Sequence, residues 1–92
     1  MKANEHLKLL GLPVEDLVTK FKGVVTGINF DLYGCVQAVV TPYAKDGKKE
    51  HSDWFDVTRL KILKNKPVMA LPNFESGYVA DGKKGAADKP LP

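Results

Sequence analysis

The sequence has a single cysteine, Cys35, so no disulfide can form within one chain. Nothing therefore points to a secreted disulfide scaffold, and a reducing cytoplasm is the expected setting. Long apolar runs are also missing, so no membrane-spanning helix is expected. The first residues, Met-Lys-Ala-Asn-Glu-His, lack the apolar run that a signal peptide needs behind its positive charge. With 92 residues, the chain is expected to form one small domain.

The net charge of +3 is not concentrated in the central part of the chain. Between Val14 and Leu63 there are seven basic and seven acidic residues, and the excess lies in the flanks. A nucleic-acid-binding domain usually carries a clustered basic patch, so this distribution disfavours nucleic acid as the partner. It stays open as the alternative function, a nucleic-acid-associated small barrel that would use an exposed aromatic residue and Lys20, Lys22, Lys61, Lys64 and Lys66.

Short runs of β-branched and aromatic residues alternate with polar residues between turn residues, which is the pattern of short strands. It predicts strands over 14–21, 23–30, 35–41, 52–56 and 61–63. Gly23 and Gly27 are expected to mark bulges or sharp bends in the second strand. Turns are predicted at 31–34 and at Asp46-Gly47. Asp56 is predicted to be a structural cap on a turn of 3-10 helix before the last strand.

Five short strands curled by glycines, with a 3-10 turn before the last, predict an all-β fold, a small SH3-like five-stranded barrel over residues 14–63. An OB-like barrel is the alternative, although it usually has longer strands and a helix between the third and fourth. Residues 1–13 predict an N-terminal helical segment, with a helix over 3–10 that stops at Gly11. Leu7 and Leu10 would pack this helix as a lid over one end of the barrel.

Several of these residues together resemble a group of small uncharacterised bacterial proteins that often occur in prophages and other mobile elements. The shared pattern is Val-Thr-x-Phe-x-Gly-Val-Val-Thr-Gly, Gly-Cys-x-Gln, Asp-Gly-Lys and Trp-Phe-Asp-x-x-Arg-Leu, spread over about residues 14–63. The sequence departs from it at Lys20, where glycine is expected. The resemblance implies a small β-barrel from a mobile gene pool, and it implies neither an activity nor any functional residue.

Candidate catalytic and metal-binding residues are few. Cys35 would need a base within hydrogen-bond reach, and His51 is the one plausible base. A small, partly buried strand residue is the better interpretation of Cys35. Glu50, His51 and Asp53 are too few and too poorly spaced for a metal site, so a solvated hairpin end is expected. The sequence therefore predicts a protein that is not an enzyme and needs no metal or cofactor.

Aromatic and apolar residues are the more informative candidates, and they predict a protein-interaction module. Trp54 and Phe55 are adjacent in a predicted strand, so only one of them can face the core, and Trp54 is expected to bury the largest area. The candidate interaction surface combines residues near turns and strand ends with apolar residues of the arm: Tyr33, Tyr43, Trp54, Phe55, Met69, Leu71, Phe74 and Tyr78.

Residues 64–92 predict an extended arm and tail rich in proline and glycine. Pro67 and Pro72 exclude a regular helix or a central strand there, so the apolar residues of the arm should lie extended across a surface. That surface is either the chain's own barrel or that of a second copy. Because the linker Lys64-Asn65-Lys66 is short, the sequence favours an exchanged-arm homodimer.

Overall fold

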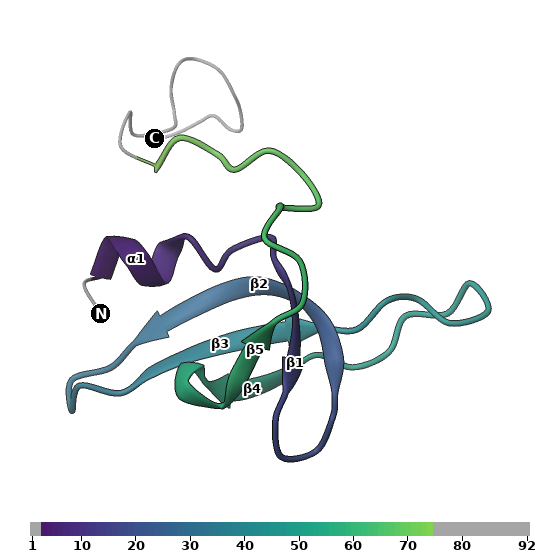
Figure 1. Cartoon of the computed structure of the whole chain (residues 1–92), viewed down its shortest axis with the longest axis horizontal. Helices are drawn as coiled ribbons and strands as arrows, with labels where there is room; N and C mark the ends of the chain where they lie inside the picture. The colour runs from purple at the N-terminus through teal and green to yellow at the C-terminus, as the bar shows by residue number, and fades with distance from the viewer. Residues whose placement is uncertain (1–2, 75–92) are drawn as a thin grey trace, which may run out of the picture.

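A computed structural model describes residues 3–74 of the chain. The elements run in the order α1 (Ala3–Leu7), β1 (Pro13–Asp16), β2 (Lys22–Phe30), β3 (Val36–Thr41), β4 (Asp53–Asp56), the 3-10 turn η1 (Val57–Arg59) and β5 (Leu60–Ile62) (Figure 1). The described part of the chain is therefore mostly β, with one short helix, and the predicted all-β class is confirmed.

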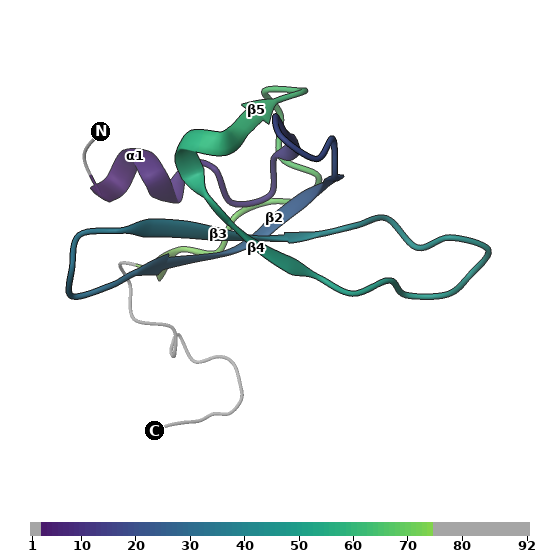
Figure 2. The ribbon, with the colours of Figure 1, turned by 90° about the horizontal axis from the view of Figure 1, so that it is seen from below.

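The five strands form one antiparallel sheet in the order β4-β3-β2-β1-β5. β4 and β5 are the two edges and do not pair with each other, so the sheet is open. α1, η1 and β5 lie on one side of the β2–β3–β4 part of the sheet (Figure 2). We call the face of that part turned toward them the inner face, and the opposite face the outer face.

β2 is the strand that bends the sheet, and its glycines explain where. The register between β2 and β3 shifts between Val25 and Gly27, which is the bulge that the sequence predicts. Gly23 is a site of close approach, because a Cβ there would lie 2.7 Å from the carbonyl carbon of Thr41. A Cβ at Gly27 would only touch Val39 at 3.5 Å, an ordinary contact. Gly23 is thus sterically required, whereas Gly27 is not.

The core lies on the inner face, where strand alternation places one apolar residue in two. Its buried members are Leu9, Leu12, Val14, Val25, Ala38, Val40 and Phe55. Phe55 pairs with Ala38, and this register turns its ring inward, leaving it 5% exposed. Trp54 pairs with Val39 on the outer face and is 53% exposed. The prediction that only one of the two aromatic residues faces the core is confirmed, but the expectation that Trp54 buries the largest area is wrong.

The helix is shorter than predicted and uses a different face. α1 ends at Leu7, and residues 8–12 continue in tight turns, with bonds such as Leu9 N–H to the carbonyl of His6 at 3.0 Å. His6 and Leu9 are the buried residues, and the His6 ring meets Phe30 edge-on at 5.9 Å. Leu7 is 38% exposed, so its expected packing is wrong, whereas Leu10 is partly buried against the core, as expected. The tight turns rotate His6 and Leu9, rather than Leu7, toward the core.

The first strand also ends earlier than predicted, at Asp16 instead of Phe21. Residues 17–19 form a turn, and Lys20 adopts a positive φ of 68°. The turn closes with hydrogen bonds from Lys20 N–H to the Asp16 carbonyl and from Asp16 N–H to the Phe21 carbonyl, each 2.8 Å. The sequence misled here because Leu17 and Val18 are apolar, yet they are 48% and 70% exposed.

The other turns follow their sequence signals. Gly34 has a φ of 91° in the β2–β3 turn, and Asp46 and Gly47 have φ of 53° and 74° at the tip of the β3–β4 connection. Two reciprocal backbone bonds of 2.9 Å join Lys45 and Lys48 around that tip. Asp56 is the N-cap of η1, and its Oδ1 accepts a hydrogen bond of 2.9 Å from the Thr58 N–H.

The described part of the arm, residues 64–74, returns to its own chain. β5 ends beside β1, where the Leu63 N–H donates to the Pro13 carbonyl at 2.9 Å. The arm therefore starts close to Gly11, whose carbonyl accepts a hydrogen bond of 2.9 Å from the Val68 N–H. A short linker is thus long enough for the return, which corrects the expectation that it would strain a fold-back.

Candidate binding groove

The most strongly organised polar contact of the described chain joins β1 to η1. The Asp16 side chain is fully buried and accepts two hydrogen bonds from Arg59, from Nε at 2.8 Å and from Nη2 at 2.7 Å. The same carboxylate accepts hydrogen bonds from the backbone N–H and the hydroxyl of Thr19, at 2.8 and 2.6 Å. Asp16 therefore holds the β1–β2 turn and η1 together. We call Asp16, Thr19 and Arg59 the clamp.

The contacts of the clamp favour the charged forms of both Asp16 and Arg59. The hydrogen bonds from Arg59 hold the pKa of Asp16 well below its usual range, and those from Thr19 act in the same direction against the effect of burial. The Asp16 carboxylate in turn raises the pKa of Arg59. Asp16 thus stays ionised when buried, and a two-pronged guanidinium contact of this kind also fixes the orientation of both side chains.

An aromatic stack continues from the clamp toward the surface. The guanidinium carbon of Arg59 lies 5.3 Å from the centre of the Phe55 ring. The Phe55 ring packs on Phe21 with centroids 5.4 Å apart. Phe21 follows the β1–β2 turn, so the clamp that fixes the turn also fixes the place of this ring. Phe55 is buried, and Phe21 is only partly covered.

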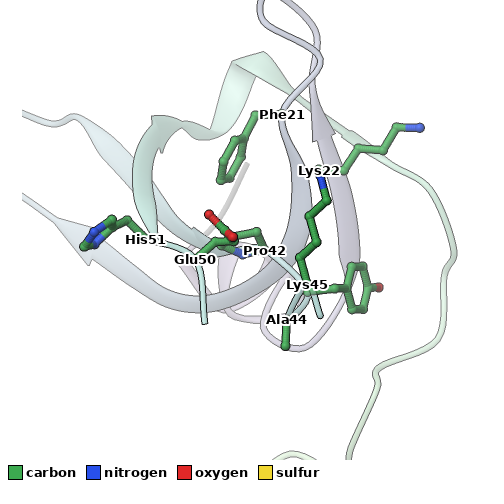
Figure 3. A pocket seen from close by; sticks show the side chains of 8 residues that line it. Phe21, Lys22, Pro42, Ala44, Lys45, Glu50 and His51 are labelled. Atoms are coloured by element: carbon green, nitrogen blue, oxygen red, sulfur yellow. The ribbon is translucent and has the colours of Figure 1, made fainter. Parts of the chain in front are cut away.

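Phe21 lies at one side of an open groove of about 610 Å³ (Figure 3). The opposite side comes from the base of the long β3–β4 connection. The full lining consists of Phe21, Lys22, Pro42, Tyr43, Ala44, Lys45, Glu50 and His51. Figure 3 shows Glu50 turned toward Phe21 and His51 turned away from it. The groove thus combines an aromatic and proline surface with two lysines and a carboxylate.

The structure distributes the predicted interaction residues over several places. Tyr43 lines the groove and is 59% exposed. Tyr33 is 88% exposed in the β2–β3 turn, at the other end of β3, and Trp54 lies on the outer face. Phe55 is in the core and cannot be part of a surface. The aromatic residues predicted from the sequence therefore do not form one site.

The predicted arm residues form a second, apolar surface. Met69, Leu71 and Phe74 line a cavity of about 310 Å³ together with residues of β2, among them Val24 and Thr26. Tyr78 lies outside the described residues.

The groups considered for catalysis or metal binding are not brought together. Cys35 is exposed just before β3, and His51 lies in the connection after β3. The length of β3, which has six residues, therefore separates the two side chains. At the rise of an extended strand this separation is about 20 Å, too far for a nucleophile and its base. No group of three potential metal ligands occurs among residues 3–74. Asp53 instead accepts a hydrogen bond of 2.9 Å from the Trp54 N–H.

Two of the lysines considered for nucleic acid are paired with an acidic residue. Glu15 lies opposite Lys22 on β2 and opposite Lys61 on β5. Directly opposed residues on neighbouring strands interact, so the negative charge of Glu15 offsets this part of the basic set. The arrangement is an alternating row across three strands and not a basic patch.

Comparisons with protein-family models, with curated proteins and with solved structures found no match for this chain. Within residues 3–74, no helix has the length and the apolar character needed to cross a membrane.

The sequence reasoning found Tyr43 but missed the other determinants of the groove. Phe21 was expected to end a strand, and the signal for its role is its place directly after a turn and before Gly23. The Asp16–Arg59 pair spans 43 positions, so no local pattern reveals it. In the sequence, Glu50 and His51 suggest only a metal ligand or, for His51, a base for Cys35, because residues of the β1–β2 turn on the other side of the groove are distant in sequence.

Proposed function

We propose that this chain is a non-enzymatic protein-interaction module of SH3-like type, and that its groove binds an extended segment of a partner protein. The observation that carries the proposal is the groove itself, with an aromatic side chain fixed to the core at one side and the mixed apolar and charged base of the β3–β4 connection at the other. Extended peptides expose apolar side chains and backbone polar groups in alternation, and aromatic-lined grooves recognise both.

Support for the SH3-like type comes from the topology. Five short strands, a 3-10 turn between the fourth and fifth, and a last strand beside the first are the features expected of this type. The curved course of β2 (Figure 1) and the bulge before Gly27 supply the curvature that a small barrel needs. A mobile-element origin belongs to the same proposal and rests on the sequence resemblance alone.

Each part of the groove has a task in this proposal. An apolar side chain of the partner would lie against Phe21, Pro42 and Tyr43. Lys45 can donate to partner carbonyl or carboxylate groups, and Glu50 can accept from partner N–H groups. Since both charged side chains belong to exposed residues, they adjust to the partner at little cost to the fold.

The test is selection of a displayed library of random peptides on the whole chain, followed by titration of the selected peptides. We expect enrichment of segments with an apolar or aromatic anchor, and a loss of affinity of roughly tenfold or more in Tyr43→Ser, as for an aromatic contact that dominates an interface. Tyr33→Ser is the control, because it removes an exposed ring of the same type at the far end of β3.

Two results would contradict the proposal. One is a selection without enrichment, or peptides that bind Tyr43→Ser as tightly as the original chain. The other is submicromolar affinity for DNA or RNA at ~0.15 M salt, which would support the nucleic-acid alternative.

A further inference from the structure

The outer face of β2, β3 and β4 carries a half-exposed tryptophan, Trp54. Ala38 and Val40 face the core, so alternation turns Val39 and Thr41 outward. Val39 pairs with Gly27 on one side and with Trp54 on the other. Because Gly27 has no side chain and Trp54 is 53% exposed, this row leaves the indole beside open space.

The polar groups next to this row already have partners. The hydroxyl of Thr41 lies 2.8 Å from the hydroxyl of Thr26 and 2.8 Å from that of Ser52. The three hydroxyls thus form a continuous hydrogen-bonded row across the face. Removing water from polar groups is costly mainly when they lose their partners, so this row can be covered without that cost.

The two rows carry no charged side chain: they consist of Thr26, Thr41, Ser52, Gly27, Val39 and Trp54. In a two-fold symmetric contact each patch meets its own copy, so a charge near the axis would face its like. An uncharged patch avoids this repulsion. The groove, in contrast, carries lysines and a carboxylate, which suit a partner of different sequence.

The arm extends this uncharged surface beyond β2. It lines a cavity with Val24 and Thr26, and several of its apolar side chains stay more than half exposed. Val68, Met69 and Phe74 are 56%, 68% and 59% exposed. Large exposed apolar side chains gathered on one part of a monomer often mark an interaction surface.

From these observations we propose that the outer face, centred on Trp54 and continued by the arm, is the contact surface between two copies of this chain. The contact joins intact molecules face to face and needs no exchange of arms, because the arm of each copy is already held at Gly11 of its own chain. It shares no residue with the groove, so it stands independently of the proposed peptide binding.

Trp54 is the only tryptophan of the chain, so its fluorescence reports on this face alone. The test uses the whole chain over a range of concentrations. Light scattering would give the mass, and tryptophan emission with acrylamide quenching would give the exposure of Trp54. The expected result is a rise from the monomer to the dimer mass, accompanied by a blue shift of the emission and by protection from the quencher. A monomer at every concentration, or a dimer whose tryptophan emission and quenching do not change, would overturn the proposal.

Trp54→Thr tests the centre of the contact and keeps a residue that favours strands. We expect its dimer dissociation constant to rise by roughly tenfold or more, as for a tryptophan at the centre of an interface. The control Tyr33→Thr removes a more exposed ring outside the face and should dimerise like the original chain. Equal dimerisation of Trp54→Thr and the original chain would refute the role of this face. If Trp54→Thr loses its cooperative melting transition, the quenching of the original chain decides alone.

Discussion

Lys20 and Asp46 are the non-glycine residues of the described chain with positive φ, and their turns are stabilised in different ways. The turn at Asp46-Gly47 is a local structure. Both of its central residues have positive φ, as a tight hairpin turn of this kind requires, and aspartate followed by glycine favours that conformation on its own. The residues around it are exposed, and its described bonds are those between Lys45 and Lys48.

The turn at Lys20 depends on contacts from elsewhere in the chain. A lysine does not favour a φ of 68°, so the surrounding structure must impose it. Asp16 does so by binding Thr19 inside the turn and Arg59 outside it. The two turns lead to opposite sides of the groove, one held by a buried carboxylate and the other by its own sequence. As a consequence, the side of the groove formed by Phe21 is fixed, and the side formed by the β3–β4 connection is more adaptable.

Asp16→Asn is expected to have the largest effect, because it leaves the partly buried guanidinium of Arg59 without its charged partner. We expect the melting temperature to fall by more than ~10 °C. The control is Glu15→Gln, which removes a neighbouring carboxylate that faces lysines on adjacent strands. Equal melting temperatures for these two variants would show that the clamp does not hold the turn.

The same carboxylate predicts the response to acid. Its pKa is lower in the folded chain than the ordinary value of 3.8, so the folded state binds this proton less readily than the unfolded state. The stabilisation is therefore complete above that value and is lost as the pH falls below it. Thermal melts from pH 6 down to about pH 2 should show this decline, and Asp16→Asn should flatten it. An equally steep decline in both chains would assign acid sensitivity to other groups.

The Gly23→Ala substitution tests the close approach of β2 to the end of β3, where the β1–β2 turn lies near the start of the β3–β4 connection. A side chain there would run into the backbone of Thr41, which can only be relieved by moving strands. We expect Gly23→Ala to lower the free energy of unfolding by ~1–3 kcal/mol or more, as overpacking does. Gly27→Ala, four residues along the same strand, has room for its methyl group and should change stability by much less. Denaturant unfolding of both variants measures the difference, and similar losses would mean that β2 is not pinned at Gly23.

Asp56→Ala tests the cap that starts η1 and thereby delivers Arg59 to the clamp. The carboxylate accepts bonds from the N–H and the hydroxyl of Thr58, and these hold its pKa below the usual range. Loss of such a cap should lower the melting temperature by ~4–8 °C, less than loss of Asp16. An unchanged melting temperature would remove Asp56 from the set of structural residues.

The same contrast between local and distant contacts decides how much could be predicted from the sequence. The strands β2 to β4, the turns at Gly34 and Asp46-Gly47, and the place of η1 depend on residues close in sequence, and the structure has them. The choice between Trp54 and Phe55 depends on the register with β3, which alternation alone does not supply. The groove depends on Phe21 and on the β3–β4 connection meeting in space, so the sequence could indicate only Tyr43.

Lys20→Gly is expected to have the smallest effect. It is the most direct test of the difference between the two turns, because it gives the β1–β2 turn the residue that a positive φ favours. A non-glycine residue at this φ costs ~1–2 kcal/mol, whereas glycine in the unfolded chain costs ~0.5–1 kcal/mol of added entropy. The net change should therefore be a gain of about 0–1.5 kcal/mol in the free energy of unfolding. Lys22→Gly is the control, since it changes an exposed lysine in a regular strand and should lose stability. If both glycine variants lose the same amount in denaturant unfolding, Lys20 is not strained, and its turn is as local as that at Asp46-Gly47.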